Sequence, residues 1–147
     1  MIDFRFEHEL SPHLVNWLVS TKRVRVDSLV VRELPWFGRR IDLAVLTKSL
    51  RTAAYELKLS NHARAIEQAG FNRLAFDRSY VASPFMPSKR VLELAEQHAL
   101  GFVLLNSTSS KVLLESPLRP IDQTLRKRLL TSLRSGAVRS DGVWSDV

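Results

Sequence analysis

Cysteine is absent from this 147-residue chain, which excludes disulfides, thiolate nucleophiles and cysteine-ligated zinc sites. Long apolar runs are also missing, since every hydrophobic stretch is far shorter than the roughly 20 residues that cross a bilayer. The opening MIDFRFEHEL lacks the basic segment and following apolar run of a secretory signal. From these absences we expect a soluble, cytoplasmic protein with no membrane partner.

Acidic residues are the scarcer charge, because 15 Asp and Glu stand against 22 Lys and Arg, for a formal net charge of +7. Only 6 of the 22 basic residues are Lys, and the Arg majority suits phosphate recognition, because a guanidinium can bind a phosphate through two parallel hydrogen bonds. A basic surface without any polyanionic partner explains the charge about as well. The length fits one domain. We place it at residues 1–135 and expect 136–147 to form a flexible tail.

Hydrophobic periodicity predicts helices alternating with strands. The first helix is expected to begin at Ser11 and Pro12, or earlier near Glu7, and the segment 35–38 reads as a turn. The expected helices are 11–23, 62–76, 89–99 and 121–134, and the expected strands are 24–34, 40–47, 52–59, 79–83, 102–105 and 111–114. The first three strands would form an antiparallel meander. This order indicates a mixed α/β fold with a central sheet flanked by helices.

Two apolar strands carry acids, and strand alternation predicts where these acids point. In the second strand, Asp42 is expected on the face opposite Ile41 and Leu43. In the third strand, Glu56 and Lys58 are expected side by side on one face. The sequence therefore places both carboxylates and one ammonium group on adjacent strands that otherwise read as core.

Buried carboxylates are costly unless they are paired or bind a metal, and two close together would also repel each other. A divalent cation relieves both costs, and oxygen ligands favour Mg²⁺ or Mn²⁺. The neighbouring Lys58 would then orient an attacking water and stabilise charge on a phosphate. These parts suit the hydrolysis of a phosphodiester bond.

The tripeptide Glu-x-Lys carries little weight alone, since roughly 0.6 copies are expected by chance in a chain of this composition. Its context, inside an apolar strand 14 residues after Asp42, carries more. Two structural alternatives stay open. Asp42 could pair with Arg39 or Arg40, and Glu56 with Lys58 could form an ion pair on a half-exposed face.

The segments RIDLAV (40–45) and AYELKL (54–59), followed by Gln68, resemble the core of the PD-(D/E)xK nuclease superfamily. The resemblance covers about residues 23–83. It implies a restriction-endonuclease-like fold, a mixed sheet flanked by helices, and a metal-dependent nuclease.

Residue by residue, the resemblance implies that Asp42 and Glu56 bind Mg²⁺ or Mn²⁺, that Lys58 positions the water, and that Gln68 lines the site. The backbone carbonyl of Leu57 would be a further metal ligand.

The chain departs from the family pattern in two ways. Ile41 stands where the family name has Pro. Many members also add an acid from the first helix or first strand, for which Glu33 is the first choice here, Glu9 the second, and Glu7 a third.

A nucleic-acid contact is predicted for two basic segments, one of which carries an aromatic residue. The residues are Arg39, Arg40, Trp36, Arg126, Lys127 and Arg128. Packing of Trp36 over the sheet end and a merely solvated basic helix are the alternatives.

The sequence thus predicts a Mg²⁺-dependent nuclease acting on DNA, with a homodimer as one way to cut two strands. A non-catalytic nucleic-acid-binding or assembly module on the same fold, and a nuclease acting on RNA, are the alternatives. Substrate structure, the number of metal ions and the oligomeric state are left open by the sequence.

Overall fold

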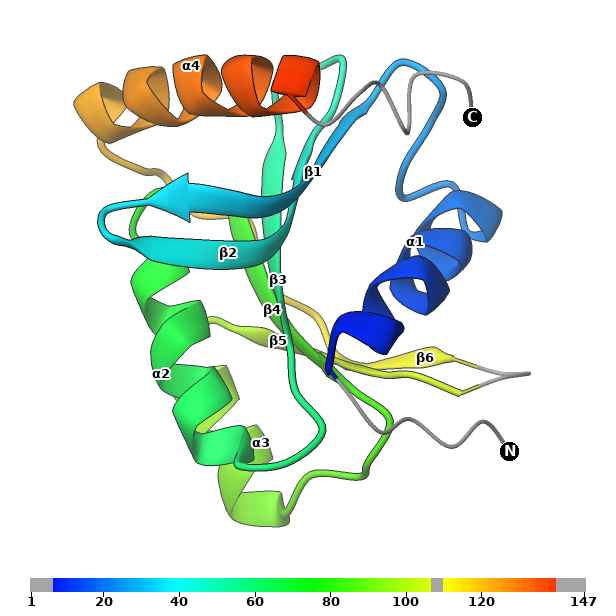
Figure 1. The fold of residues 1–147 in the computed structure, drawn as a ribbon. Coiled ribbons are helices and arrows are strands. Elements are labelled where there is room, and N and C mark those ends of the chain that lie inside the picture. The colour runs from blue at the N-terminus through cyan, green and yellow to red at the C-terminus, as the bar shows by residue number, and fades with distance from the viewer. Residues whose placement is uncertain (1–6, 107–109, 140–147) are drawn as a thin grey trace.

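The computed structural model describes residues 7–106 and 110–139. Six strands form one mixed sheet whose spatial order follows the chain, β1-β2-β3-β4-β5-β6 (Figure 1). The strands are β1 (Leu29–Trp36), β2 (Arg39–Leu46), β3 (Thr52–Leu57), β4 (Arg78–Ser83), β5 (Gly101–Leu104) and β6 (Lys111–Leu114). The helices are a 3₁₀ turn, η1 (Glu7–Glu9), and α1 (Leu10–Ser20), α2 (His62–Asn72), α3 (Lys89–Gln97) and α4 (Gln123–Arg139).

The predicted meander is confirmed, because β1–β2 and β2–β3 are both antiparallel. Strands β3, β4 and β5 are parallel, and the two crossovers carry α2 and α3. The final pair, β5–β6, is antiparallel. The predicted fold class, a mixed sheet flanked by helices, is therefore the observed one.

Helices cover both faces of the sheet (Figure 1). Helix α1 packs on one face through Leu14 and Leu18, against side chains such as Tyr55 of β3. Helices α2 and α3 cover the other face at β4 and β5. Helix α4 lies on β1 and β2, where Leu129 and Leu133 are fully buried. Within the described residues, no helix combines the length and hydrophobicity needed to cross a membrane.

Several expected boundaries are wrong at the ends of elements. Strand β1 begins at Leu29 rather than at Val24, because the chain first turns tightly after α1 and leaves Val26 72% exposed. Helix α1 has Glu9, not Ser11, at its N-cap. Helix α2 ends at Asn72, whose carbonyl oxygen accepts the next turn's amides.

Helix α4 continues past the expected domain boundary at residue 135. It ends at Arg139, and Gly136 lies so close to β1 that an added Cβ would stand 2.9 Å from Val31. Residues 140–147 of the expected tail lie outside the described residues.

The β1–β2 hairpin bends midway, and this bend places the site. Pairing runs as far as Arg32–Leu43 and resumes at Leu34–Ile41. At the interruption Glu33 has a φ of 51°, in the left-handed region, which reverses the alternation of side chains. Ile41 therefore packs with the α4 side of the sheet, while Leu43 packs with the α1 side. The expectation that these two residues share a face is wrong.

The hairpin tip is a two-residue turn of Phe37 and Gly38, which both have positive φ. Pro35 and Trp36, expected in the turn, belong to β1 instead.

Candidate functional site

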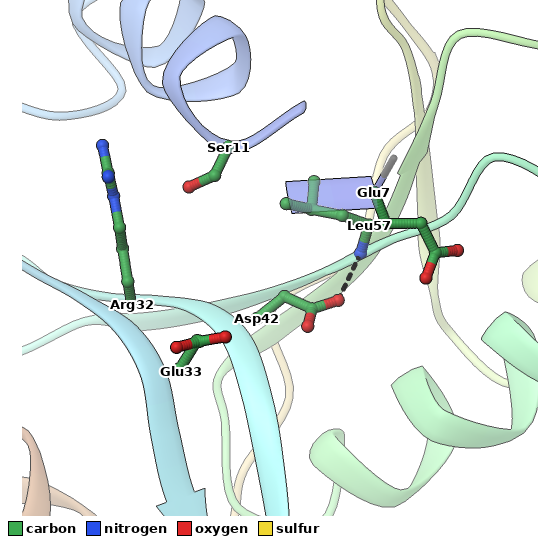
Figure 2. A pocket seen from close by; sticks show the side chains of 6 residues that line it. All are labelled: Glu7, Ser11, Arg32, Glu33, Asp42 and Leu57. Atoms are coloured by element: carbon green, nitrogen blue, oxygen red, sulfur yellow. Dashed lines mark hydrogen bonds between the residues drawn. The ribbon is translucent and has the colours of Figure 1, made fainter. Parts of the chain in front are cut away.

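Asp42 lies on β2 where this strand separates from β3 at the bend. Their backbone pairing ends at Leu43–Tyr55. Beyond it, Oδ2 of Asp42 accepts a hydrogen bond of 2.8 Å from the backbone N–H of Leu57 (Figure 2). The Asp42 carboxylate thus accepts the hydrogen bond that a backbone carbonyl of β2 would accept in a continuous pair of strands. This bond holds the carboxylate at the carboxyl end of β3.

Glu56 is the most deeply buried acid of the site, with 2% of its surface exposed. It points to the α2 side, where Nδ2 of Asn72 donates a hydrogen bond of 2.8 Å to its Oε1. The pKa of Glu56 is raised to about 8, mainly by burial and next by the negative charge of nearby Asp42, whose effect is larger than the lowering caused by the Asn72 hydrogen bond. Two carboxyl groups on adjacent strands are therefore held close together in a poorly solvated place.

Lys58 follows directly after β3 and is held there by its backbone N–H, which donates to the carbonyl oxygen of Ala82 at 3.1 Å. Its side chain is 18% exposed, and Nζ lies 3.7 Å from Oε1 of Glu7. The other oxygen of Glu7 accepts from the backbone N–H of Leu59 at 3.3 Å. Glu7 of the 3₁₀ turn η1 thus contacts both the ammonium group of Lys58 and the backbone beside it.

Gln68 lies on α2 one turn before Asn72, on the same side of that helix. Its Oε1 is buried and has no hydrogen-bond partner among the described residues. An unsatisfied buried amide oxygen is unfavourable, and a water that donates a hydrogen bond to it, or a cation that it coordinates, would remove the cost.

A pocket of about 450 Å³ opens beside Asp42. Six residues line it, from η1, α1 and the first three strands: Glu7, Ser11, Arg32, Glu33, Asp42 and Leu57 (Figure 2). The Oγ of Ser11 is buried and also lacks a partner within the described part of the chain. The pocket therefore offers acids, one arginine and one unsatisfied hydroxyl oxygen to a polar ligand.

The described residues contain no group of three or more His, Cys, Asp and Glu side chains arranged to hold a metal ion. Asp42 and Glu56 form a pair of oxygen donors, which is the donor type that Mg²⁺ and Mn²⁺ prefer. The buried free oxygen of Gln68 on the same helix face as Asn72 suits the same kind of ion. The residues present fit such a cation through these atoms.

The third acid is left without an assignment by this geometry. Glu33 lines the pocket, but its side chain is 70% exposed and lies 3.8 Å from Arg40. Glu9 is exposed at the start of α1. Glu7, ranked last from the sequence, reaches Lys58. A third carboxylate ligand and the carbonyl of Leu57 both stay predictions.

Two of the residues predicted to contact nucleic acid instead make contacts within the protein. Trp36 is 5% exposed and packs in the core beneath α4, so it is not a free surface ring. Arg126 forms an ion pair of 3.0 Å with the buried Asp77, and it also donates to the carbonyl oxygen of Leu50. Lys127 is exposed on the same helix.

The other predicted basic residues are exposed or half-buried. The guanidinium of Arg39 lies 4.6 Å from the ring centre of Phe71, and that of Arg128 lies 4.7 Å from that of Phe37. Arg40 is exposed on β2.

Asn72 is one of three residues whose place at the site the sequence did not predict. Its position four residues after Gln68 puts it on the same helix face, and this spacing could have indicated it. Ser11 and Arg32 were missed as pocket residues because nothing in the local sequence brings α1 over β1.

No protein-family model matches the sequence, and no curated protein sequence matches it. A solved structure of a protein of unknown function from Silicibacter pomeroyi is similar over 95% of this chain and 90% of its own, with a TM-score of 0.71 and 19% identity. A repair endonuclease from Pyrococcus abyssi is similar over 72% of this chain and 50% of its own, with a TM-score of 0.50 and 18% identity. At these identities the likeness establishes a shared fold, the restriction-endonuclease-like arrangement of sheet and helices.

Proposed function

We propose that this protein is a divalent-metal-dependent nuclease that hydrolyses phosphodiester bonds in DNA. The observation that carries the proposal is the position of Glu56, a buried carboxyl group beside Asp42 whose pKa is raised to about 8. Such a pair is costly to the fold, and clusters of this kind are concentrated at functional sites. Lys58 follows two residues later, at the same end of β3.

In this proposal Asp42 and Glu56 hold Mg²⁺ or Mn²⁺, with the carbonyl of Leu57 as a further ligand. The bound cation would neutralise the two carboxylates and polarise the phosphodiester. Lys58 orients the attacking water and stabilises negative charge on the phosphate, which requires that it exchange its 3.7 Å contact with Glu7 for the substrate. Gln68 supports the site through its buried amide oxygen.

DNA is proposed as the substrate because the chain is basic and because its fold is shared with a repair endonuclease. A homodimer would place two such sites on one duplex and allow both strands to be cut. A cytoplasmic location is part of the same proposal.

A non-catalytic nucleic-acid-binding module on this fold is the second candidate. It is favoured by two observations, the lack of a third clustered metal-ligating side chain among the described residues and the engagement of Lys58 by Glu7.

A cleavage assay separates the two. Linear, nicked, single-stranded and branched DNA, together with RNA, would be incubated with Mg²⁺ or Mn²⁺ and with wild type, Lys58→Ala or the control Lys111→Ala, an exposed lysine on β6. We expect cleavage by wild type and by the control, and loss of cleavage in Lys58→Ala. Cleavage of RNA and of no DNA would show that the substrate is RNA rather than DNA.

A binding measurement covers the case of no cleavage. Calorimetric titration with Mn²⁺ should detect binding by wild type and none by Asp42→Ala. If wild type neither binds the ion nor cuts any substrate but still binds DNA, the non-catalytic module is correct.

A further inference from the structure

Three exposed apolar side chains gather at the hairpin tip, next to the site described above. Leu74 is 62% exposed, Phe37 49% and Phe71 37%, although large apolar residues favour burial. They surround a depression of about 200 Å³, called the aromatic hollow here, which is lined by Trp36, Phe37, Phe71, Leu74, Ala75 and Leu125. It is thus built from the β1–β2 hairpin, the end of α2 and the start of α4.

Arginines stand over the rings of this hollow. Arg39 lies on Phe71 and Arg128 on Phe37, at 4.6 and 4.7 Å from guanidinium carbon to ring centre. Lys127, next to Arg128 on α4, is exposed. An apolar floor with cations at its rim is complementary to a ligand that is itself flat, apolar on its faces and flanked by negative charge.

The hollow lies beside the candidate catalytic residues. Phe71 directly precedes Asn72, whose amide holds Glu56. Arg39 lies on β2 three residues before Asp42, and its charge acts on the Glu56 carboxyl group. Phe71 and Arg39 therefore connect the hollow with the residues around Glu56.

We propose that the aromatic hollow binds an unpaired nucleobase of single-stranded DNA, which stacks on Phe71 and Phe37 while Arg39 and Arg128 bind the adjoining phosphates. The class of ligand rests on the proposed function. Base stacking on aromatic side chains combined with basic groups along the backbone is how proteins bind single strands. In a duplex the base faces are covered by their neighbours, so the hollow selects unpaired ends or gaps.

The test measures binding rather than cleavage. A labelled oligothymidylate and a labelled blunt DNA hairpin, whose strands are joined by a polyether linker so that it has no unpaired base, would be titrated with the full chain in EDTA, and fluorescence anisotropy would report the dissociation constants. Phe71→Ala should weaken binding of the single strand about 5- to 100-fold, the range of stacking contributions in such proteins. Its affinity for the blunt hairpin should change less than twofold.

Two further variants make the test specific. Phe85→Ala removes a ring that is 56% exposed in the loop after β4, outside the hollow, and should bind as wild type. Phe71→Trp keeps a stacking surface and should retain affinity. The thermal unfolding of Phe71→Ala is recorded alongside, so that a loss of folded protein is not read as a loss of stacking.

The proposal is overturned if Phe71→Ala binds the oligothymidylate as tightly as wild type, or if wild type has no preference for it over the blunt hairpin. It is also overturned if Phe71→Ala instead abolishes self-association in analytical ultracentrifugation, since a second copy would then cover the hollow. The binding test is run in EDTA and does not depend on cleavage. If the protein binds the single strand there but cuts no DNA in the cleavage assay with Mg²⁺ or Mn²⁺, the proposed nuclease is contradicted and this inference stands.

Discussion

The amide of Asn72 donates a 2.8 Å hydrogen bond to the buried carboxyl group of Glu56, and this bond joins the end of α2 to the end of β3. Burial and the charge of Asp42 both raise the pKa of Glu56, and Asn72 is the contact that offsets them most. Asn72 is not among the residues that line the pocket beside Asp42, and its amide bonds Glu56, so we assign it to the positioning of Glu56.

Replacement of Asn72 should therefore act through Glu56. In Asn72→Ala, the ionised carboxyl group loses its donor, so the pKa of Glu56 should rise above 8 and the protein should lose about 1–3 kcal/mol at alkaline pH. Urea unfolding would measure the loss. If the same replacement costs as much in a Glu56→Ala background, the contribution of Asn72 does not pass through Glu56.

The raised pKa of Glu56 makes stability depend on pH with a defined sign. A carboxyl group whose pKa goes from 4.5 in the unfolded chain to about 8 in the fold binds its proton more tightly when folded. Its contribution is fully present below pH 4.5 and is lost as the pH rises through about 8. The stability of wild type relative to Glu56→Gln, which cannot ionise, should fall by a few kcal/mol over that range.

Urea unfolding of both proteins in EDTA across this pH range would measure the fall. Mg²⁺ added above pH 8 should raise the stability of wild type and leave Glu56→Gln unchanged, because binding to the folded state alone is stabilising. A flat difference across the range would mean that Glu56 is solvated in solution.

Adjacent residues of α4 should behave differently when their charge is removed. Arg126→Met breaks the ion pair with Asp77, which also accepts hydrogen bonds from the backbone N–H and hydroxyl of Thr52. Leaving Asp77 buried without its cation should cost about 3 kcal/mol. Lys127→Met removes an exposed charge and should change stability by less than about 0.5 kcal/mol.

In DNA binding we expect the opposite, with a larger effect from Lys127→Met than from Arg126→Met. Lys127→Met is expected to reduce the salt dependence of DNA affinity by about one counterion, and Arg126→Met should leave it unchanged. Thermal unfolding and DNA titrations at several salt concentrations would check both. A salt slope of Lys127→Met equal to that of wild type would exclude Lys127 from the DNA contact.

Glycine replacements test the packing of the sheet. Gly101 begins β5, where an added Cβ would overlap the ring of Tyr80 and approach the carbonyl oxygen of Leu114 to 2.8 Å. The ring cannot move away easily, because it stacks on Tyr55 at 4.9 Å. Gly101→Ala should therefore lose more than about 2 kcal/mol.

Gly70 is the matched control, because it lies inside α2 and an added Cβ there meets nothing within 4 Å. Gly70→Ala should gain about 0.5–1 kcal/mol, since alanine loses less backbone entropy in a helix. Denaturant unfolding compares the two, and a tolerated alanine at Gly101 would show that β5 can shift away from Tyr80.

Local sequence was enough to predict the order of the elements, the meander and the strand that carries Glu56. Alternation along a strand is a property of the backbone, so the direction of Glu56 relative to Tyr55 and Leu57 follows from their spacing alone. The caps of α2 and α3 are equally local, because the side chains of Asn61 and Ser88 accept hydrogen bonds from backbone N–H groups only three residues away.

What the sequence could not predict depends on contacts between distant segments. The left-handed residue Glu33 reverses the alternation on both strands of the hairpin, so Ile41 and Leu43 face opposite sides. That bend, and the packing of α4 above it, bury Trp36 and leave Phe37 exposed.

Contacts between distant segments also determine which residues bond the side chains of the candidate site. Asn72 reaches Glu56 across 16 residues, and Glu7 reaches Leu59 across 52 residues, next to Lys58. Residue types and spacing specified which side chains a strand presents, because that is set by backbone geometry. Only the packing of helices on the bent sheet decided which groups meet there, because the position of one element against another depends on the whole core.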